Sequence, residues 1–388
     1  MPGQFKVISV DDHVQEPPGL WTGKLSAAKF GDNIPHVAAQ PDGTERWVVE
    51  GQVLSGMPVA ETGALTAERF GTGPRKWGEV PAAVYEPKER LKMMDADGID
   101  ASVLYPTVSG GGGEVLASIK NADLQVACVQ AYNDWLLETW AKASPRFIPQ
   151  CLVPISSVAA AVAELERAVK AGHKGVIVPI DPAHLQEDAL SIYSPDWDAL
   201  WSKAQQLDVP VCFHSGSAPK LLLDLYPGVD QAVQAAFNAV REPVSSSAVL
   251  GKLLFSGIPE RFPTLKFVLA NSGVGWGSYS LEVCDHEWDR KFRQITPVEM
   301  KPPPYEMELP SDMFHRQCFL TASFDAMGLR VRDFIGVDNM LWHSEFPSPT
   351  STYPNSKQTI AENFKGVPDD ERTKILSSNA AKIYKLSL

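Results

Sequence analysis

Short apolar segments alternate with longer amphipathic segments through most of this chain of 388 residues. The short segments are apolar on both faces, which is typical of strands in a parallel sheet covered by helices. We expect eight strands, at residues 7–10, 101–106, 147–154, 175–179, 209–214, 266–270, 318–322 and 339–343. We expect helices between them, including residues 87–97, 123–143, 158–171, 197–207 and 369–384. The alternation predicts an α/β fold, a (β/α)8 TIM barrel.

One stretch interrupts this pattern, between about residues 22 and 84. Gly, Pro and polar residues are frequent there, and residues 46–54 predict a hairpin that turns at Glu50-Gly51. We interpret the stretch as an insertion that packs over the barrel. Barrels with insertions commonly reach this length, so residues 1–388 are expected to form a single domain.

The composition excludes several classes of protein. A net charge of −12 argues against binding to nucleic acid or to an anionic membrane surface, because both require a basic face. No apolar run reaches the ~18–20 residues of a membrane span, and the N-terminus lacks the apolar core of a signal peptide. The five cysteines are scattered, which favours reduced and mostly buried thiols. A cytoplasmic enzyme is expected.

Polar residues stand where the predicted strands end, and barrel enzymes carry their chemistry at those ends. The residues concerned are Asp11, Asp12, His13, Glu16, His214, Asn271, His343 and Glu345. The members of the pairs Asp11/His13 and His343/Glu345 are two residues apart, so each pair can face one side of a strand. Carboxylates with imidazoles are typical metal ligands. Taken singly, an Asp-Asp pair is often a cap or a turn, and a lone histidine is often a core residue.

The chain resembles the branch of the amidohydrolase superfamily that contains metal-dependent decarboxylases and hydrolases on (β/α)8 barrels. The resemblance covers nearly the whole chain. It includes residues 11–17, 87–91, 97–98, 103–106, 214, 262–268, 273–276, 342–347 and 379–381. It implies a metal held by Asp11, His13, His214 and Glu345.

Three positions depart from that family's pattern. Glu345 stands where Asp is usual, Ser348 where a His is often found, and Asn271 where a His or Glu is common. An amide cannot act as a base. The usual combination of a metal-bound water and a titratable partner therefore looks incomplete.

The chain has more candidate ligands than one tetrahedral zinc requires. The predicted ligands are Asp11, His13, Glu16, His214, His343 and Glu345. Six such residues suit two octahedral ions of iron or manganese. The candidate catalytic residues are Asp12, as a bridging or supporting carboxylate, and Asn271, which would orient the substrate.

With these ligands the chain resembles a smaller amidohydrolase-like group, the nonheme diiron monooxygenases of platensimycin- and platencin-type diterpenoid assembly. That resemblance implies two iron ions that activate dioxygen and hydroxylate an unactivated carbon of a bulky terpenoid or coenzyme A-linked substrate. The chain shows no flavin or nicotinamide fingerprint, so an external electron donor is expected.

Two alternatives remain open. One is a mononuclear zinc or manganese hydrolase or decarboxylase, in which Asn271 and Ser348 orient the substrate. Metal binding by His343 and Glu16 distinguishes the oxygenase from this alternative. The other is a barrel that has lost catalysis and serves as a binding protein or scaffold, although the retained ligand residues argue against it.

Partners are only weakly indicated. Lys220, Arg330 and Arg332 could meet the phosphates of coenzyme A, but a lone basic residue is more often a solvated surface charge. The prolines at 302–304 mark an extended segment of the kind that family members use in dimer contacts, so a homodimer is a further hypothesis.

Overall fold

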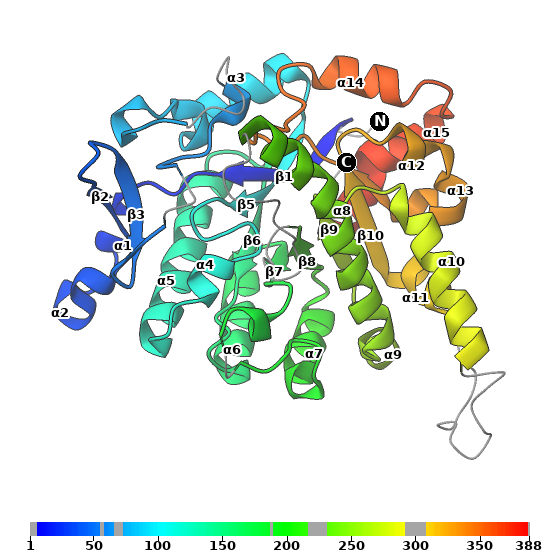
Figure 1. Ribbon diagram of the computed structural model, residues 1–388, viewed down its shortest axis with the longest axis horizontal. Helices are drawn as coiled ribbons and strands as arrows, with labels where there is room; N and C mark the ends of the chain where they lie inside the picture. Colours follow the sequence, from blue (N-terminus) through cyan, green and yellow to red (C-terminus); the bar gives the residue numbers. More distant parts are fainter. Residues whose placement is uncertain are drawn as a thin grey trace.

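A barrel of eight parallel strands forms the centre of the protein (Figure 1). The computed structural model describes residues 6–54, 58–65, 73–186, 189–215, 231–291 and 308–386. In spatial order the strands are β1 (Ile8–Val14), β5 (Ala101–Pro106), β6 (Phe147–Leu152), β7 (Gly175–Ile177), β8 (Val211–His214), β9 (Phe267–Ala270), β10 (Cys318–Ala322) and β11 (Met340–Trp342). The predicted TIM-barrel fold is confirmed.

The barrel is nearly closed where the first strand meets the segment after the last. His13 N donates to Phe346 O at 2.6 Å, and Glu345 N donates to Asp11 O at 3.0 Å. These bonds hold residues 345–346 beside the C-terminal end of β1. Two segments more than 300 residues apart in sequence therefore lie at one rim of the barrel.

Strand β1 is longer than the sequence predicts. Residues 12–14 continue the parallel pairing with β5, and the register shifts between Ser9 and Asp12. The polar residues Asp11, Asp12 and His13 therefore lie within the strand and not in a loop after it. The shift leaves Ser9 and Asp12 in contact, with Ser9 Oγ donating to Asp12 Oδ1 at 2.8 Å.

Helices surround the strands. They are α1 (Gly19–Thr22), α2 (Ala27–Phe30), α3 (Pro87–Asp97), α4 (Glu114–Ala117), α5 (Ala122–Trp135), α6 (Val158–Ala171), α7 (Asp198–Leu207), α8 (Gln231–Phe255), α9 (Ile258–Arg261), α10 (Trp276–Trp288), α11 (Pro310–Gln317), α12 (Ala326–Arg330), α13 (Arg332–Ile335), α14 (Ser356–Asn363), α15 (Asp369–Thr373) and α16 (Asn379–Tyr384). The predicted bounds of α3 and α6 are confirmed. Pro87 begins α3 and Gly98, at φ +82°, ends it in the left-handed conformation that glycine adopts without strain. None of the helices in the described ranges is both long and apolar enough to cross a membrane.

The insertion forms a three-stranded antiparallel sheet of β2 (His36–Ala39), β3 (Glu45–Val49) and β4 (Gln52–Val53). The predicted hairpin is confirmed, since β3 pairs with β4. In Figure 1 these strands lie at the left, beside the helices of the first half of the barrel. Farther along the insertion, Ala64 N donates to Pro347 O at 2.9 Å. The insertion therefore reaches the same rim as β1 and residues 345–346.

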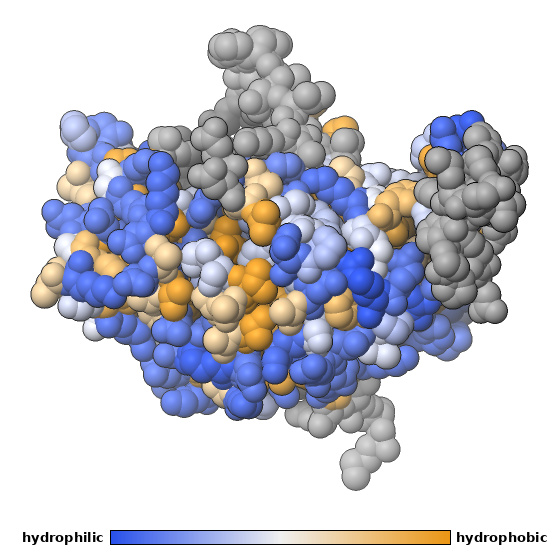
Figure 2. All heavy atoms as spheres, turned by 90° about the horizontal axis from the view of Figure 1, so that it is seen from below, coloured by the Kyte–Doolittle hydropathy of each residue, from blue (hydrophilic) through white to orange (hydrophobic). Residues whose placement is uncertain are grey.

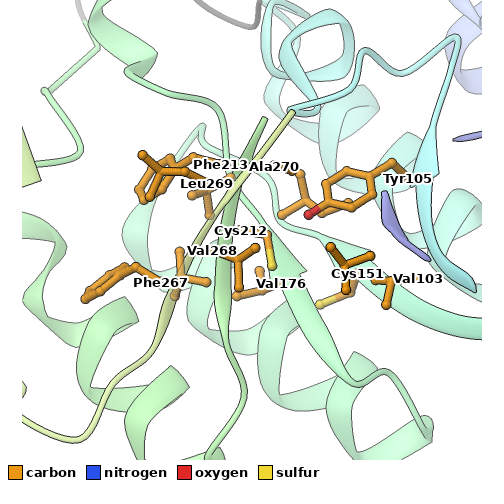
Figure 3. Packing of buried hydrophobic residues seen from close by; sticks show 14 of the residues in the cluster. Val103, Tyr105, Cys151, Val176, Cys212, Phe213, Phe267, Val268, Leu269 and Ala270 are labelled. Atoms are coloured by element: carbon orange, nitrogen blue, oxygen red, sulfur yellow. The ribbon is translucent and has the colours of Figure 1, made fainter. Parts of the chain in front are cut away.

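The barrel interior is filled by apolar side chains. Figure 3 shows Val103, Cys151, Val176 and Cys212 among them, on neighbouring strands. Because side chains fill it, this interior is a packed core and not a pore. Burying a Val- or Leu-sized side chain contributes roughly 1.5–3 kcal/mol to the stability of the fold. All five cysteines are free, and four are buried, as predicted. The outer face seen in Figure 2 is mostly hydrophilic, with hydrophobic residues gathered near its middle.

Candidate metal centre

Three predicted ligands meet at one end of the barrel. Asp11 and His13 come from β1, and His214 comes from the end of β8. One ligand atom from each lies within 4.8 Å of the others, and they form the one such group of three or more among the described residues. His13 Nε2 lies 3.4 Å from Asp11 Oδ1, and His214 Nε2 lies 3.4 Å from Asp11 Oδ2. The two Nε2 atoms are 3.2 Å apart.

Backbone carbonyls fix the orientation of both imidazole rings. His13 Nδ1 lies 2.8 Å from Pro106 O, and His214 Nδ1 lies 2.6 Å from Ser215 O. A carbonyl oxygen only accepts, so each Nδ1 must carry the proton and donate it. In a neutral ring this leaves the lone pair on Nε2, directed toward Asp11. Ligating histidines are commonly held by this kind of contact on the other ring nitrogen.

The Asp11 carboxylate is fully buried, and neither of its oxygens accepts a hydrogen bond in the described part of the chain. Burial works to raise its pKa, but the charges of His214 and His13 outweigh burial and lower it. Asp11 in turn raises the pKa of His214 to about 9 against the effect of burial. A buried carboxylate that faces two Nε2 atoms is stabilised by a positive charge, which either a protonated histidine or a metal ion between the three side chains can supply. The group fits a divalent metal ion.

A cavity of about 320 Å³ opens over this group. The residues that line it are His13, Pro58, Glu61, Pro106, Thr107, Gly111, Glu114, His214, Ser215, Glu345 and Ser348. The glycine loop at 110–113 forms part of the wall. At Gly111 a Cβ atom would lie 2.7 Å from His214 Nδ1, so only glycine lets the backbone come this close to the ring.

The structure does not bring Glu16 into the metal group. Its carboxylate accepts from the backbone amides of Thr107, Val108 and Ser109 at 3.2, 2.9 and 3.0 Å, and from the Ser109 hydroxyl at 2.8 Å. Burial nevertheless raises its pKa, because these donors offset only part of the desolvation. Glu16 holds the loop that follows β5, and this loop forms one wall of the cavity.

His343 and Glu345 also lie outside the three-residue group. His343 is buried, its Nδ1 lies 2.9 Å from Thr321 Oγ1, and burial lowers its pKa to about 4. Glu345 lines the cavity and accepts from Asn271 Nδ2 at 2.7 Å and from Thr350 Oγ1 at 2.5 Å. Burial raises the Glu345 pKa. Asn271 therefore fixes a carboxyl group at the rim, and metal binding by Glu345 stays a prediction.

Asp12 lies on the other side of β1 from the cavity lining. Its Oδ1 accepts from Ser9, from the Ser344 hydroxyl at 2.5 Å and from Phe346 N at 3.2 Å. Its Oδ2 accepts from the Ser102 hydroxyl. Asp12 thus ties β1 to β5 and to the segment after β11. These contacts give the predicted catalytic residue a structural role.

Two cavity residues were missed from the sequence, Glu61 and Glu114. Burial raises the pKa of both carboxyl groups. Glu114 follows the glycine loop after β5, so the rule that drew attention to His214, a polar residue after a barrel strand, could have found it. Glu61 lies in the insertion, and no local pattern marks it.

The comparison with known families agrees with this geometry. A family model described as amidohydrolase matches residues 58–386, which is most of the chain. The chain belongs to this amidohydrolase family. The family-level prediction is thereby confirmed, and so is the prediction of an enzyme in its general form.

Curated relatives of this amidohydrolase are decarboxylases. A gamma-resorcylate decarboxylase from Rhizobium sp. (strain MTP-10005) is 24% identical over 305 residues, covering 76% of this chain and 86% of the relative. One from Polaromonas sp. (strain JS666) is 24% identical over 322 residues, covering 81% and 92%.

Solved structures share the fold. An amidohydrolase from Mycobacterium avium subsp. paratuberculosis K-10 has a TM-score of 0.74 and 21% identity, covering 98% of this chain and 99% of that one. A dihydroxybenzoic acid decarboxylase from Polaromonas sp. JS666, solved with manganese and the inhibitor 2-nitroresorcinol, has a TM-score of 0.65 and 19% identity, covering 99% and 98%.

The predicted diiron monooxygenase, an iron-dependent oxidoreductase of terpenoid biosynthesis, is wrong. The relatives are decarboxylases, and a solved neighbour binds manganese, which gives no support to two iron ions. The prediction counted six ligands by residue type, whereas Glu16 and His343 have other partners in the fold. The predicted electron donor was required only by the oxygenase reaction. The mononuclear decarboxylase, the alternative from the sequence, agrees better with these relatives.

The other partner predictions are untested. Arg332 forms an ion pair with Glu371 at 2.5 Å, so its charge already has a partner. Lys220 and the prolines at 302–304 lie outside the described residues. The coenzyme A-linked substrate and the homodimer stay predictions.

Proposed function

We propose that this chain is a mononuclear metal-dependent decarboxylase that acts on a small hydroxylated aromatic carboxylic acid. The observation that carries the proposal is the buried Asp11 carboxylate, which accepts no hydrogen bond from the residues that the structure describes and faces the Nε2 atoms of His13 and His214. The names of the curated relatives support the reaction, and the alignments with these relatives cover about three-quarters of the chain.

Asp11, His13 and His214 would hold one divalent ion. An oxygen and imidazole donor set suits manganese, and zinc is the alternative. When bound, the ion supplies positive charge that stabilises negative charge on oxygens of the substrate. The carbonyls of Pro106 and Ser215 hold the two rings in place.

The cavity favours a small substrate. Its volume of about 320 Å³ is at the low end of ligand sites, which span ~300–1,000 Å³. A single aromatic ring with its substituents fits a space of this order. Glu61, Glu114 and Glu345 line the wall and can exchange hydrogen bonds with ring hydroxyl groups.

Decarboxylation requires two contributions from the residues of the protein. The carboxylate carbon must be held with its bond to the ring free to break, and a proton must then reach the ring carbon. Asn271 and Thr350 hold Glu345 at the rim with short hydrogen bonds, so this carboxyl group is a fixed orienting element for the substrate.

The test is carbon dioxide release by the manganese-loaded enzyme from 2,6-dihydroxybenzoate, 5-carboxyvanillate and related hydroxybenzoates. We expect turnover of at least one of these acids, and its loss together with bound metal in His214→Ala. The matched control is His315→Ala, an exposed imidazole on α11, which should keep both metal and activity. A metal-loaded protein that hydrolyses esters or amides and releases no carbon dioxide would contradict the proposal.

A further inference from the structure

The wall of the cavity over the metal group carries charges of one sign. Apart from the two histidines, the charged side chains among its described lining residues are Glu61, Glu114 and Glu345, and that part of the lining contains no lysine or arginine. The carboxylate of a substrate is attracted to a metal ion and repelled by these side chains. The other substituents of the ring therefore face the glutamates, and groups that donate hydrogen bonds are favoured there.

The three glutamates differ in what they can still bind. Both oxygens of Glu345 accept hydrogen bonds from side chains. The carboxyl group of Glu114 is turned onto its own loop, because a Cβ atom at Gly110 would lie within 2.7 Å of both its oxygens. Glu61 accepts through Oε1 alone among the described residues, from the Gly63 amide at 2.8 Å. Its Oε2 is therefore available to a ligand in the cavity.

The segment that carries Glu61, residues 58–65 of the insertion, is firmly attached to the barrel. Glu61 N donates at 3.1 Å to the side chain of Gln15, a buried residue directly after β1. Gly63 lies so close to Pro349 that an added Cβ atom would be 2.5 Å from its Cγ. These contacts join the segment to the strand that carries two of the metal ligands and to the rim after β11. A side chain on such a segment has a fixed place relative to the metal group.

We propose that Glu61 determines which ring substituents the enzyme accepts, a role that rests on the proposed function. Its carboxylate accepts a hydrogen bond from a hydroxyl or amino group on the ring and repels a second carboxylate at the same position. The Gly63 amide supports this role, because a hydrogen bond to a carboxylate favours the charged form. Of the acids named above, 5-carboxyvanillate carries two carboxyl groups and should therefore be a poor substrate.

Ligand binding tests this role separately from turnover. The ligands are 3- and 4-aminobenzoate, which carry one carboxylate and one donor group, and benzene-1,3- and benzene-1,4-dicarboxylate, in which a second carboxylate replaces the amino group. Calorimetry with the manganese-loaded protein measures each Kd. We expect at least one aminobenzoate to bind about 10- to 100-fold more tightly than the dicarboxylate of the same geometry, as for a hydrogen bond to a charged group.

Glu61→Gln should reduce this preference by about 10-fold or more, because the neutral amide neither repels a carboxylate nor accepts as strongly. The amide oxygen can still accept from Gly63, so the segment should keep its fold. Glu61→Lys should reverse the preference in favour of the dicarboxylate. Both variants should retain manganese, since Glu61 lies outside the metal group. The matched control is Glu260→Gln, an exposed glutamate on α9, which should leave the preference unchanged.

The outcomes separate this role from the reaction. An unchanged preference in Glu61→Gln overturns the role of Glu61, and carbon dioxide release by the wild type then leaves the proposed function standing. Equal weakening of all four ligands also overturns the role, because a merely structural residue would act in that way. A wild type that binds none of the four, or shows no preference, overturns it as well. If the preference depends on Glu61 but no acid releases carbon dioxide, recognition by Glu61 stands and the proposed reaction fails.

Discussion

The two faces of strand β1 carry adjacent aspartates that the fold treats in opposite ways. Asp11 is 0% exposed and Asp12 is 2% exposed, so burial does not distinguish them. Asp11 accepts no hydrogen bond in the described part of the chain, whereas four donors surround Asp12. Asp11 faces two histidines at the cavity, and Asp12 faces three serines between strands.

The difference shows that the hydrogen-bond partners of a buried carboxylate decide whether it stabilises the fold or can bind a cation. A carboxylate with hydrogen-bond donors all around it stabilises the fold, because it loses them on unfolding. A buried carboxylate without hydrogen-bond donors destabilises the fold unless a cation lies beside it. Such a carboxylate is therefore expected where the protein binds a cation. Burial raises the pKa of Asp12, although Arg90 and the serine hydroxyls work to lower it, while the histidines lower the pKa of Asp11.

The largest expected effect is a loss of stability when Asp12, on the side of β1 that faces away from the cavity, is replaced. Asp12→Ala removes the acceptor of Ser9, Ser102 and Ser344 and the negative charge that acts on the buried Arg90 guanidinium. We expect the free energy of unfolding to fall by about 3–5 kcal/mol, because each buried donor left without an acceptor costs about 1–3 kcal/mol. Chemical denaturation of the metal-free protein measures it. A loss below about 1 kcal/mol would show that Asp12 does not tie the strands together.

On the cavity face, Asp11→Asn should act on metal binding. We expect metal affinity to fall by at least about 100-fold, the upper end of what removing a partner that merely supports a ligand costs. The unfolding free energy of the metal-free protein should fall much less than in the Asp12 variant. Metal titration and denaturation of the same preparation give both quantities. Equal losses of stability in the two variants would erase the contrast between the faces.

The loop above the metal group gives a smaller effect. Gly111→Ala places a Cβ atom against His214 Nδ1 and should tilt the ring, weakening metal affinity by about 10-fold, as for other losses of ligand support. The control is Gly78→Ala, where an added Cβ meets nothing within 4 Å. Unchanged metal affinity in Gly111→Ala would mean that the loop yields and the ring does not move.

The smallest effect should come from trimming one donor of Asp12. Ser344→Ala removes one of four hydrogen bonds, and the loss should be about 1 kcal/mol, with metal affinity unchanged. Denaturation and metal titration again provide the measurements. A fall in metal affinity here would show that the two faces of β1 are coupled, which would weaken the separation drawn between Asp11 and Asp12.

Much of this was predictable from local sequence. The rule that strand side chains alternate placed Asp11 with His13 and apart from Asp12, and the structure agrees. The rule that chemistry follows barrel strands located His214 before any coordinates. Glu16 was assigned as a ligand because its residue type is suitable, but three backbone amides and a hydroxyl from residues 107–109 occupy its oxygens. Those donors come from a loop some 90 residues away, and no local pattern could reveal them.

The sequence by itself determined the barrel and the end of the barrel that carries the polar residues, because apolar periodicity and strand alternation are properties of neighbouring residues. The tertiary structure alone decided which carboxylates remain without donors, and it brought Glu61, Glu114 and Glu345 from three segments to one cavity. The physical reason is that a buried polar group is defined by its partners, and long-range folding supplies them.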